Sequence, residues 1–238
     1  MNKLAVVTGG FGGIGYAVVK ELDALGYGIV ILSRTAESEE NQAKLAALTT
    51  DRKMAINCDV TVAEQVESAI FTVVKDYGNI DILVNCAGWT QPVVHTNLDD
   101  LSDMLFDKIV VSNLRSVFTV VRAVNPFLNN DSVIVNIGSA SAARRGGSSL
   151  AYTASKAGVE SLTRNLAVAL APKTRVVVVS PGFVDTGFNS NANKYLAISS
   201  TPMGRVATPE DVADAVVCAI NNKFMTGNMI VVDGGRSI

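Results

Sequence analysis

The sequence contains few of the residues that build metal sites and disulfide frameworks. One histidine and three cysteines occur in 238 residues. The cysteines, Cys58, Cys86 and Cys218, are odd in number, and their wide spacing matches neither a metal site nor a set of disulfide bonds. We therefore expect no bound metal and a reduced, cytoplasmic setting.

Basic charge is also scarce. Lysine and arginine number 20 against 22 acidic residues, a net charge of −2. Nucleic acids and anionic membranes both require a basic surface, so we expect neither as a partner. No apolar stretch reaches the roughly 18 residues of a transmembrane helix. The first residues, MNKLAVVTGG, have no full apolar region or cleavage site of a signal peptide, and we interpret them as a first strand.

The chain does contain 48% apolar residues, in a regular alternation of short β-rich segments and longer helical ones. No linker or repeat interrupts it, so residues 1–238 are expected to form one domain. Predicted strands are 3–8, 28–33, 54–59, 81–88, 132–139, 174–180 and 228–235; predicted helices end near 25 or span 61–78, 98–127, 151–170 and 208–220. The strands are rich in valine and isoleucine, as expected when both faces are covered. This pattern predicts an α/β fold with a doubly wound, seven-stranded parallel sheet, which binds ligands at the carboxyl ends of its strands.

Two of these helices have recognisable ends. Thr61 and Glu64 predict a capping box, and Gly78 is expected to close the same helix. In the stretch TPEDVADAVVCAI, Thr208 is expected to cap a helix whose first residue is Pro209.

A glycine-rich turn, TGGFGGIG at 8–15, lies between the first strand and the first helix. Gly9, Gly13 and Gly15 suit a tight turn whose backbone amides approach a pyrophosphate at a helix N-terminus. The alternative is a flexible turn. The position between strand and helix favours a nucleotide phosphate site.

The second strand ends in ILSRT, which offers Ser33 and Arg34 where a site for NADH would offer an acid. An arginine can form paired hydrogen bonds to a 2′-phosphate, so we favour NADPH over NADH. A plain surface arginine is the alternative. Gly12, just before Gly13, is not basic, so one possible second phosphate contact is missing.

The stretch YTASK, residues 152–156, places a tyrosine and a lysine one helical turn apart. Taken alone, the pair is interpreted as structural. In hydride transfer to a carbonyl, however, the resulting alkoxide needs a proton, and a tyrosine with an ordinary pKa of about 10 is a poor proton shuttle near neutrality. The ammonium of Lys156 would favour the phenolate and lower the pKa of Tyr152.

Together these motifs resemble the short-chain dehydrogenase/reductase family over essentially the whole chain. The family's T-G-x-x-x-G-x-G turn is matched at 8–15, its N-N-A-G motif by NCAG at 85–88, and its Y-x-x-x-K by Tyr152 and Lys156. Further matches are Asp59 after the third strand, Asn113 in the long helix, Ser139 after the fifth strand, and Pro181, Gly182 and Thr186 after the sixth. The resemblance implies a single-domain Rossmann fold.

It also implies roles for individual residues. Tyr152 would donate the proton, Lys156 would hold the nicotinamide ribose, and Ser139 would bond the substrate oxygen. Asn113 would hold a water that continues the proton path. The cofactor-binding residues that the resemblance implies are Thr8, Gly9, Gly13, Ile14, Gly15, Ser33, Arg34, Asp59, Val60, Asn85, Ala87, Gly88, Tyr152, Lys156, Pro181, Gly182, Val184 and Thr186.

Several residues keep two interpretations. His95 is a general base or, as we favour, a surface or packing residue; Cys86 is interpreted as a small buried residue. Trp89 lines a substrate or cofactor wall or simply packs. Arg144 and Arg145, in the loop that overhangs the substrate in this family, bind an anionic substrate group or lie in solvent or a subunit contact. Residues 187–205 correspond to the family's mobile lid, in which Phe188 is a further substrate candidate.

The pattern looks most like the 3-oxoacyl-carrier-protein reductase branch, so we expect NADPH-dependent reduction of a β-ketoacyl thioester. Near the end of the long helix, NPFLNND offers no base to dock an acidic carrier, and the region before the sixth strand offers only Lys173 and Arg175. The alternatives are a reductase or dehydrogenase of a sugar, polyol or other small ketone, and a non-catalytic NADP-binding sensor. The resemblance also implies a homotetramer built through 98–127, 151–170 and the last strand, and apolar residues available on these helices include Val117, Phe118 and Val121.

Overall fold

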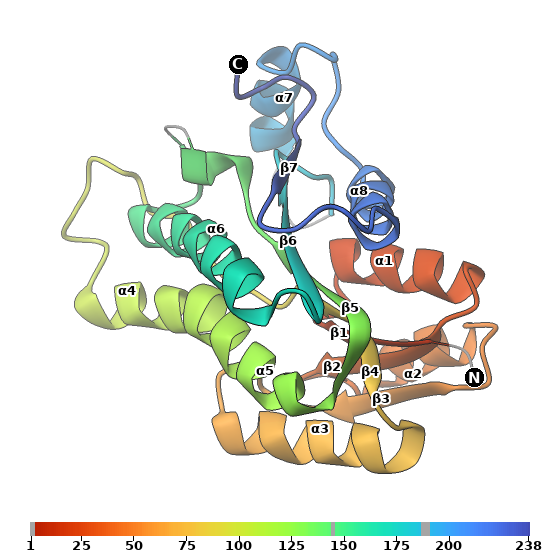
Figure 1. Ribbon diagram of the computed structural model, residues 1–238. Coiled ribbons are helices and arrows are strands. Elements are labelled where there is room, and N and C mark those ends of the chain that lie inside the picture. The colour runs from red at the N-terminus through yellow and green to blue at the C-terminus, as the bar shows by residue number, and fades with distance from the viewer. Residues whose placement is uncertain (1–2, 144–145, 187–190) are drawn as a thin grey trace.

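The chain forms one seven-stranded parallel sheet. The computed structural model describes residues 3–143, 146–186 and 191–238, and its strands lie in the order β3-β2-β1-β4-β5-β6-β7 (Figure 1). Their bounds are β1 Leu4–Thr8, β2 Gly28–Ser33, β3 Lys53–Asn57, β4 Ile80–Asn85, β5 Leu128–Ile137, β6 Thr174–Pro181 and β7 Met229–Val232. The strand order reverses between β1 and β4, so the predicted doubly wound sheet is confirmed. A crevice for ligands is expected at this reversal, outside the carboxyl ends of the strands.

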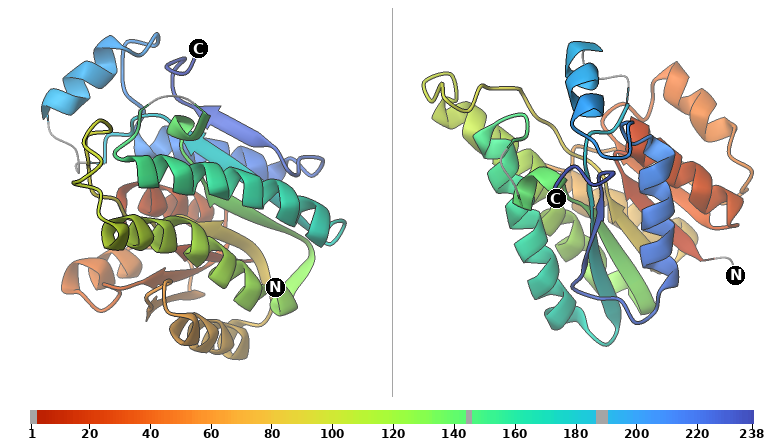
Figure 2. Two further views of the ribbon diagram at one scale, coloured as in Figure 1. Left: turned by 90° about the vertical axis from the view of Figure 1, so that its left-hand side faces the viewer. Right: turned by 90° about the horizontal axis from the view of Figure 1, so that it is seen from above.

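Helices cover both faces of the sheet (Figure 1). One face carries α1 (Gly13–Ala24), α2 (Glu39–Ala46) and α8 (Pro209–Asn221). The other carries α3 (Ala63–Tyr77), α4 (Asp103–Val110), α5 (Ser116–Val124) and α6 (Leu150–Leu170). A further helix, α7 (Asn191–Ser199), stands out from the rest of the molecule in both views of Figure 2.

Each central strand contributes to two hydrophobic cores. In β1, Ala5 and Val7 pack into the core beneath α1 and α8, whereas Leu4 and Val6 pack into the core beneath α3, α5 and α6. Successive side chains of a strand point to opposite faces, so a strand covered on both faces is apolar at every position. Each fully buried valine or leucine of this kind contributes roughly 1.5–3 kcal/mol to stability. The result is a rigid base for the segments that follow the strands.

The long helical segment differs from the prediction. It begins at Asp103 rather than near residue 98, because Ser102 caps it by accepting a hydrogen bond from the Leu105 amide at 3.3 Å. It is also not uniform: a π-helical turn, Val111–Arg115, separates α4 from α5. Such turns widen the helix locally and often occur at functional sites.

The start of α3 also corrects a prediction. Thr61 and Glu64 form no capping box, since the helix begins at Ala63 and Val62 provides no side-chain cap. Thr61 instead donates its hydroxyl to Asp59 at 2.7 Å. At the other end, Gly78 closes the helix with φ of 82°, as predicted.

Two helices were not predicted at all. The segment that became α2 contains few apolar residues and shows no clear helical periodicity. The segment that became α7 lies within residues 187–205, which were interpreted as a mobile lid, and it begins with polar, asparagine-rich sequence. Within the part of the chain that the structure describes, no helix has the length and apolar character needed to cross a membrane.

Candidate active site

Three hollows that share wall residues lie at the carboxyl ends of the strands. The cofactor cleft, about 620 Å³, is lined by the glycine-rich turn, the segments after β2 and β3, and Thr186. The inner hollow, about 360 Å³, is lined by Ser139, Tyr152 and Lys156 and shares Thr186 with the cofactor cleft. The outer cleft, about 820 Å³, shares Ser139 and Tyr152 with the inner hollow and extends to Leu196 of α7. The three together form one continuous path.

The glycine-rich turn closes tightly on its neighbours. Gly9 has φ of 65°, and a Cβ there would lie 2.9 Å from the Ala87 Cα. A Cβ on Gly15 would lie 2.2 Å from the Gly9 carbonyl oxygen. Only glycine fits such approaches, and the turn leads directly into the N-terminus of α1. The cleft floor is therefore backbone, which suits the phosphates of a dinucleotide.

The segments after β2 and β3 form the far end of the cofactor cleft. Arg34 is exposed there, and the hydroxyls of Ser33 and Thr35 are hydrogen-bonded at 3.2 Å. Burial alone would raise the pKa of Asp59, but hydrogen bonds from Thr61 and the charge of Arg34 outweigh it and hold that pKa below its ordinary value. This end of the cleft therefore combines a carboxylate with a nearby guanidinium.

Tyr152 lies in the first turns of α6, whose N-terminus is capped by Ser149: its hydroxyl accepts a hydrogen bond from the Tyr152 amide at 3.2 Å. The Tyr152 hydroxyl is hydrogen-bonded to Ser139. Burial raises the pKa of Tyr152 above its ordinary value, and the bond with Ser139 offsets only part of that rise. Tyr152 therefore holds its proton at neutral pH.

Lys156 is buried one turn further along α6. Its ammonium donates a hydrogen bond to the Ile137 carbonyl at 2.7 Å and lies 5.9 Å from the centre of the Tyr152 ring. Burial lowers the pKa of Lys156 to about 8. The expectation that Lys156 lowers the pKa of Tyr152 is therefore wrong for this structure, because desolvation dominates both groups.

Asn113 sits in the π turn between α4 and α5. Its amide nitrogen donates to the carbonyls of Trp89 at 2.6 Å and Ile109 at 2.8 Å, and its amide oxygen accepts from the Trp89 backbone at 3.2 Å. The protein accepts both hydrogens of the Asn113 side-chain nitrogen. The side chain can therefore hold a water only by accepting a hydrogen bond from it at the amide oxygen. Asn113 fixes the loop after β4 against the helices.

Comparison with known proteins agrees with this geometry. A family model described as enoyl-(acyl carrier protein) reductase matches residues 9–237. The chain is 34% identical to carbonyl reductase family member 4 of Danio rerio and 33% identical to the 3-oxoacyl-[acyl-carrier-protein] reductase of Bos taurus; each match covers 100% of this chain and 99% of the relative. The crystal structure of 3-ketoacyl-(acyl-carrier-protein) reductase from Brucella melitensis in complex with NADH superimposes with a TM-score of 0.89 at 30% identity, over 99% of this chain and 98% of that one.

The chain belongs to the short-chain dehydrogenase/reductase family. Members act as oxidoreductases, and a nicotinamide cofactor fits the glycine-floored cleft of this one. In this short-chain dehydrogenase/reductase, the predicted cofactor-binding residues that line the cofactor cleft or the inner hollow are Gly9, Gly13, Ile14, Gly15, Ser33, Arg34, Asp59, Val60, Ala87, Gly88, Tyr152, Lys156, Pro181, Gly182, Val184 and Thr186.

Two predicted cofactor residues of this short-chain dehydrogenase/reductase lie behind the walls rather than on them. The hydroxyl oxygen of Thr8 accepts hydrogen bonds from the Cys86 and Ala87 amides, both at 3.1 Å. Asn85 is buried and donates to the Asn136 amide oxygen at 2.9 Å. Both side chains hold β4 in place, and their role in cofactor binding stays a prediction.

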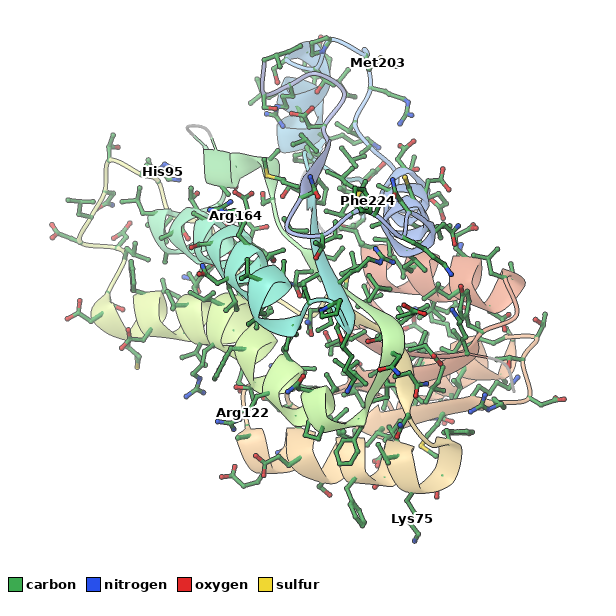
Figure 3. All side chains as sticks on the ribbon, in the orientation of Figure 1. Lys75, His95, Arg122, Arg164, Met203 and Phe224 are labelled. Carbon is green, nitrogen blue, oxygen red and sulfur yellow. The ribbon has the colours of Figure 1, made fainter. Side chains whose placement is uncertain are left out.

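The substrate side of the short-chain dehydrogenase/reductase is described only in part. Trp89 lines the inner hollow, and the ammonium of Lys108 lies 4.3 Å from the centre of its ring. His95, labelled in Figure 3, lies on the loop after β4; it lines the outer cleft, and its Nε2 is buried without a hydrogen-bond partner. Arg144, Arg145 and Phe188 lie outside the described residues.

Two further residues of the short-chain dehydrogenase/reductase bear on the predictions. Burial raises the pKa of the Cys86 thiol to about 11, although the charge of Lys156 opposes this, so the thiol is protonated rather than nucleophilic. Among the described residues, no group of three histidine, cysteine or acidic side chains could hold a metal ion.

Sequence reasoning missed part of the cofactor cleft. Its walls also include Phe11, Thr35, Glu40, Asn41, Lys44 and Ser112. Three of these come from α2, whose signal was present: Ser38 caps that helix, and Glu40 precedes Lys44 by four residues. Local capping and charge spacing could therefore have found it, although hydrophobic periodicity could not.

Proposed function

We propose that this protein reduces a carbonyl group to a secondary alcohol with NADPH as the hydride donor. The proposal rests on one observation: Ser139, Tyr152 and Lys156 converge on the inner hollow, which joins the cofactor cleft to the outer cleft. A carbonyl group there would face both the nicotinamide and the tyrosine hydroxyl.

The geometry assigns a task to each side chain. Reduced nicotinamide, when bound, supplies the hydride. Tyr152 donates its proton to the oxygen that becomes the alcohol, and its raised pKa keeps that proton in place at neutral pH. Ser139 bonds to the same oxygen and stabilises its developing charge. Lys156 holds the nicotinamide ribose, as the resemblance to the family implies, and its ammonium lies 5.9 Å from the centre of the Tyr152 ring.

NADPH is proposed over NADH because of Arg34. Its guanidinium is exposed at the end of the cofactor cleft beside the hydroxyls of Ser33 and Thr35. These groups suit a 2′-phosphate, since an arginine binds phosphate through paired, charge-assisted hydrogen bonds. The relative from Brucella melitensis was crystallised with NADH, so the cofactor ratio needs direct measurement.

A 3-oxoacyl thioester is the proposed substrate. The support comes from the reductases named above, which act on 3-oxoacyl carrier proteins by their names, and from the outer cleft, whose volume of about 820 Å³ leaves room for an acyl chain. Docking of an acidic carrier finds little support near β6. There the Arg175 guanidinium donates to the carbonyls of Ala219 at 2.9 Å and Ile220 at 2.7 Å, so it is occupied within the fold.

A substrate panel tests this proposal. NADPH and NADH are each supplied with acetoacetyl thioesters of coenzyme A and of a carrier protein, a crotonyl thioester, simple ketones and sugars, and nicotinamide absorbance is followed. We expect NADPH oxidation with acetoacetyl thioester. Turnover of sugars or ketones alone would establish the alternative substrate class, turnover of the crotonyl thioester alone would indicate an enoyl reductase, and cofactor binding without any turnover would indicate a sensor.

Replacement of Tyr152 by phenylalanine tests the proton donor. The change removes only the hydroxyl, so we expect kcat to fall by about a hundred- to ten-thousand-fold while NADPH affinity is unchanged. Stopped-assay turnover and cofactor titration measure the two quantities. Retained activity would rule out Tyr152 as the proton donor.

Location and assembly complete the proposal. We propose a cytoplasmic protein, since its three cysteines are free. We also propose a homotetramer, in keeping with the resemblance to the family.

A further inference from the structure

Lys44 is a second cationic side chain, besides Arg34, that lines the cofactor cleft. Lys44 and Asn41 of α2 line the same cleft as Arg34 and Thr35. The Asn41 amide donates to the Thr35 carbonyl at 2.8 Å and to the Thr35 hydroxyl at 2.9 Å. Because Asn41 is 7% exposed and lies one turn before Lys44, these bonds fix α2 relative to the segment that carries Arg34.

The ammonium of Lys44 is held at the edge of this cleft. It lies 2.7 Å from the Glu40 carboxylate and 5.6 Å from the centre of the Tyr16 ring. The Tyr16 hydroxyl donates to the Lys44 carbonyl at 3.2 Å, which ties α2 to the helix that follows the glycine-rich turn. The Lys44 side chain is 31% exposed, whereas that of Glu40 is 78% exposed.

We propose that Lys44 is a second cation for the 2′-phosphate of NADPH and that Glu40 holds it in place until the phosphate binds. This inference rests on the proposed use of NADPH. A phosphate monoester carries nearly two negative charges at neutral pH, which one guanidinium does not balance, and Gly12 at the glycine-rich turn brings no charge.

The ion pair between Lys44 and Glu40 is weak enough for a phosphate to replace the Glu40 carboxylate. An exposed ion pair four residues apart on a helix is weak, so a dianion can replace the carboxylate as the partner of Lys44. The hydrogen bond and charge of Lys44 hold the pKa of Glu40 below its ordinary value, so the carboxylate is charged and repels an incoming phosphate. NADH, with a neutral 2′-hydroxyl, gains nothing from Lys44.

Cofactor titration tests the inference. Trp89 is the only tryptophan of the chain and lines the inner hollow, so quenching of its fluorescence reports the binding of NADPH and NADH. Lys44→Met is expected to weaken NADPH binding about tenfold, the loss of one charge-assisted hydrogen bond, with NADH binding unchanged. Lys44→Arg is expected to keep most of the affinity, and Glu40→Gln to tighten NADPH binding alone.

Lys20→Met is the matched control. Lys20 lies 5.8 Å from the centre of the same Tyr16 ring but pairs with Glu210 of α8 at 3.2 Å and does not line the cofactor cleft. Lys20→Met should leave the affinities for NADPH and NADH unchanged. Thermal unfolding of each variant shows whether a loss of binding reflects a loss of folding.

The outcomes separate this inference from the proposed function. In one outcome the wild-type protein prefers NADPH and Arg34→Asp reduces that preference, but Lys44→Met leaves the affinities for NADPH and NADH unchanged or lowers both equally. The role of Lys44 is then overturned and NADPH use stands. If Glu40→Gln weakens NADH binding, Glu40 bonds the ribose hydroxyl and the exchange is overturned. If the wild-type protein prefers NADH and Arg34→Asp leaves the ratio unchanged, both proposals fall together.

Discussion

At the scale of single residues, burial shifts the two proposed proton-handling groups in opposite directions. The pKa of Tyr152 is raised and that of Lys156 is lowered to about 8, since desolvation disfavours the charged form of each. Both groups are therefore closer to their neutral forms than in water. A phenol that keeps its proton suits reduction, in which Tyr152 is the donor.

This predicts a fall in activity at alkaline pH. Below pH about 8 Lys156 carries its charge, and as pH rises through that value the ammonium is lost, so kcat/KM for NADPH should decline. Because arginine stays charged, the activity that Lys156→Arg retains should not change with pH across this range. A pH profile of initial rates measures the effect. A wild-type profile that stays flat to pH 10 would show that Lys156 does not titrate there.

Within the glycine-rich turn, glycine is required at position 15 but not at position 12. A Cβ at Gly15 would meet the Gly9 carbonyl oxygen at 2.2 Å, whereas one at Gly12 would lie 3.4 Å from the same oxygen, an ordinary contact. We expect Gly15→Ala to lower the free energy of unfolding by about 1–3 kcal/mol and Gly12→Ala to change it little. Urea unfolding without cofactor measures both. Equal effects would mean that the turn can open at no cost.

Much of the candidate site could be predicted from local sequence. The glycine-rich turn and the Tyr152–Lys156 spacing each lie within a few residues, so their geometry follows from one turn or one helix. The pKa of Tyr152, the bonds of Asn113 and the place of Lys44 depend on segments far apart in the sequence. Contacts between distant segments and burial in the folded chain determine these three properties, and a local sequence pattern predicts neither the contacts nor the burial.

At the scale of helices and strands, local end motifs predicted some helix ends and failed at others. The prediction for α8 was right to within one residue, because Thr208 accepts from the Asp211 amide at 3.3 Å and Asp211 accepts from the Thr208 amide at 2.7 Å. The predicted box at Thr61 failed because Asp59 competes for that hydroxyl. The π turn at Asn113 has no local signature, since the tertiary bonds to Trp89 accompany it.

The capping box of α8 can be measured. Thr208→Ala removes the side-chain acceptor, so we expect a loss of about 1 kcal/mol in the free energy of unfolding. Thr72→Ala is the control, because its hydroxyl bonds the Ser68 carbonyl within α3 and is no cap, so alanine there should cost little. Denaturant titrations compare the two. A smaller loss for Thr208→Ala than for Thr72→Ala would show that the box contributes nothing.

At the scale of the whole molecule, large apolar side chains are exposed on the helices that the resemblance assigns to assembly. α4 and α5 run end to end through the π turn, beside α6 in the left view of Figure 2, and Met104, Phe118 and Val168 are exposed on these helices. Val117 and Val121, which the sequence offered for assembly, are instead buried in the core of this chain. The proposed tetramer therefore depends on Phe118 rather than on those valines, together with the edge strand β7.

Light scattering after gel filtration tests that assembly. The wild-type protein is expected at four times the mass of one chain, and Phe118→Asp should halve that mass, because it places a charge in the centre of one predicted helix interface. Phe71→Asp is the matched control: Phe71 is 67% exposed on α3, away from the predicted interfaces, so the tetramer should persist. A wild-type mass equal to one chain would contradict the proposal. If both variants dissociated equally, the interface would lie on a different face, since a single contact centred on α4, α5 and α6 cannot depend on α3.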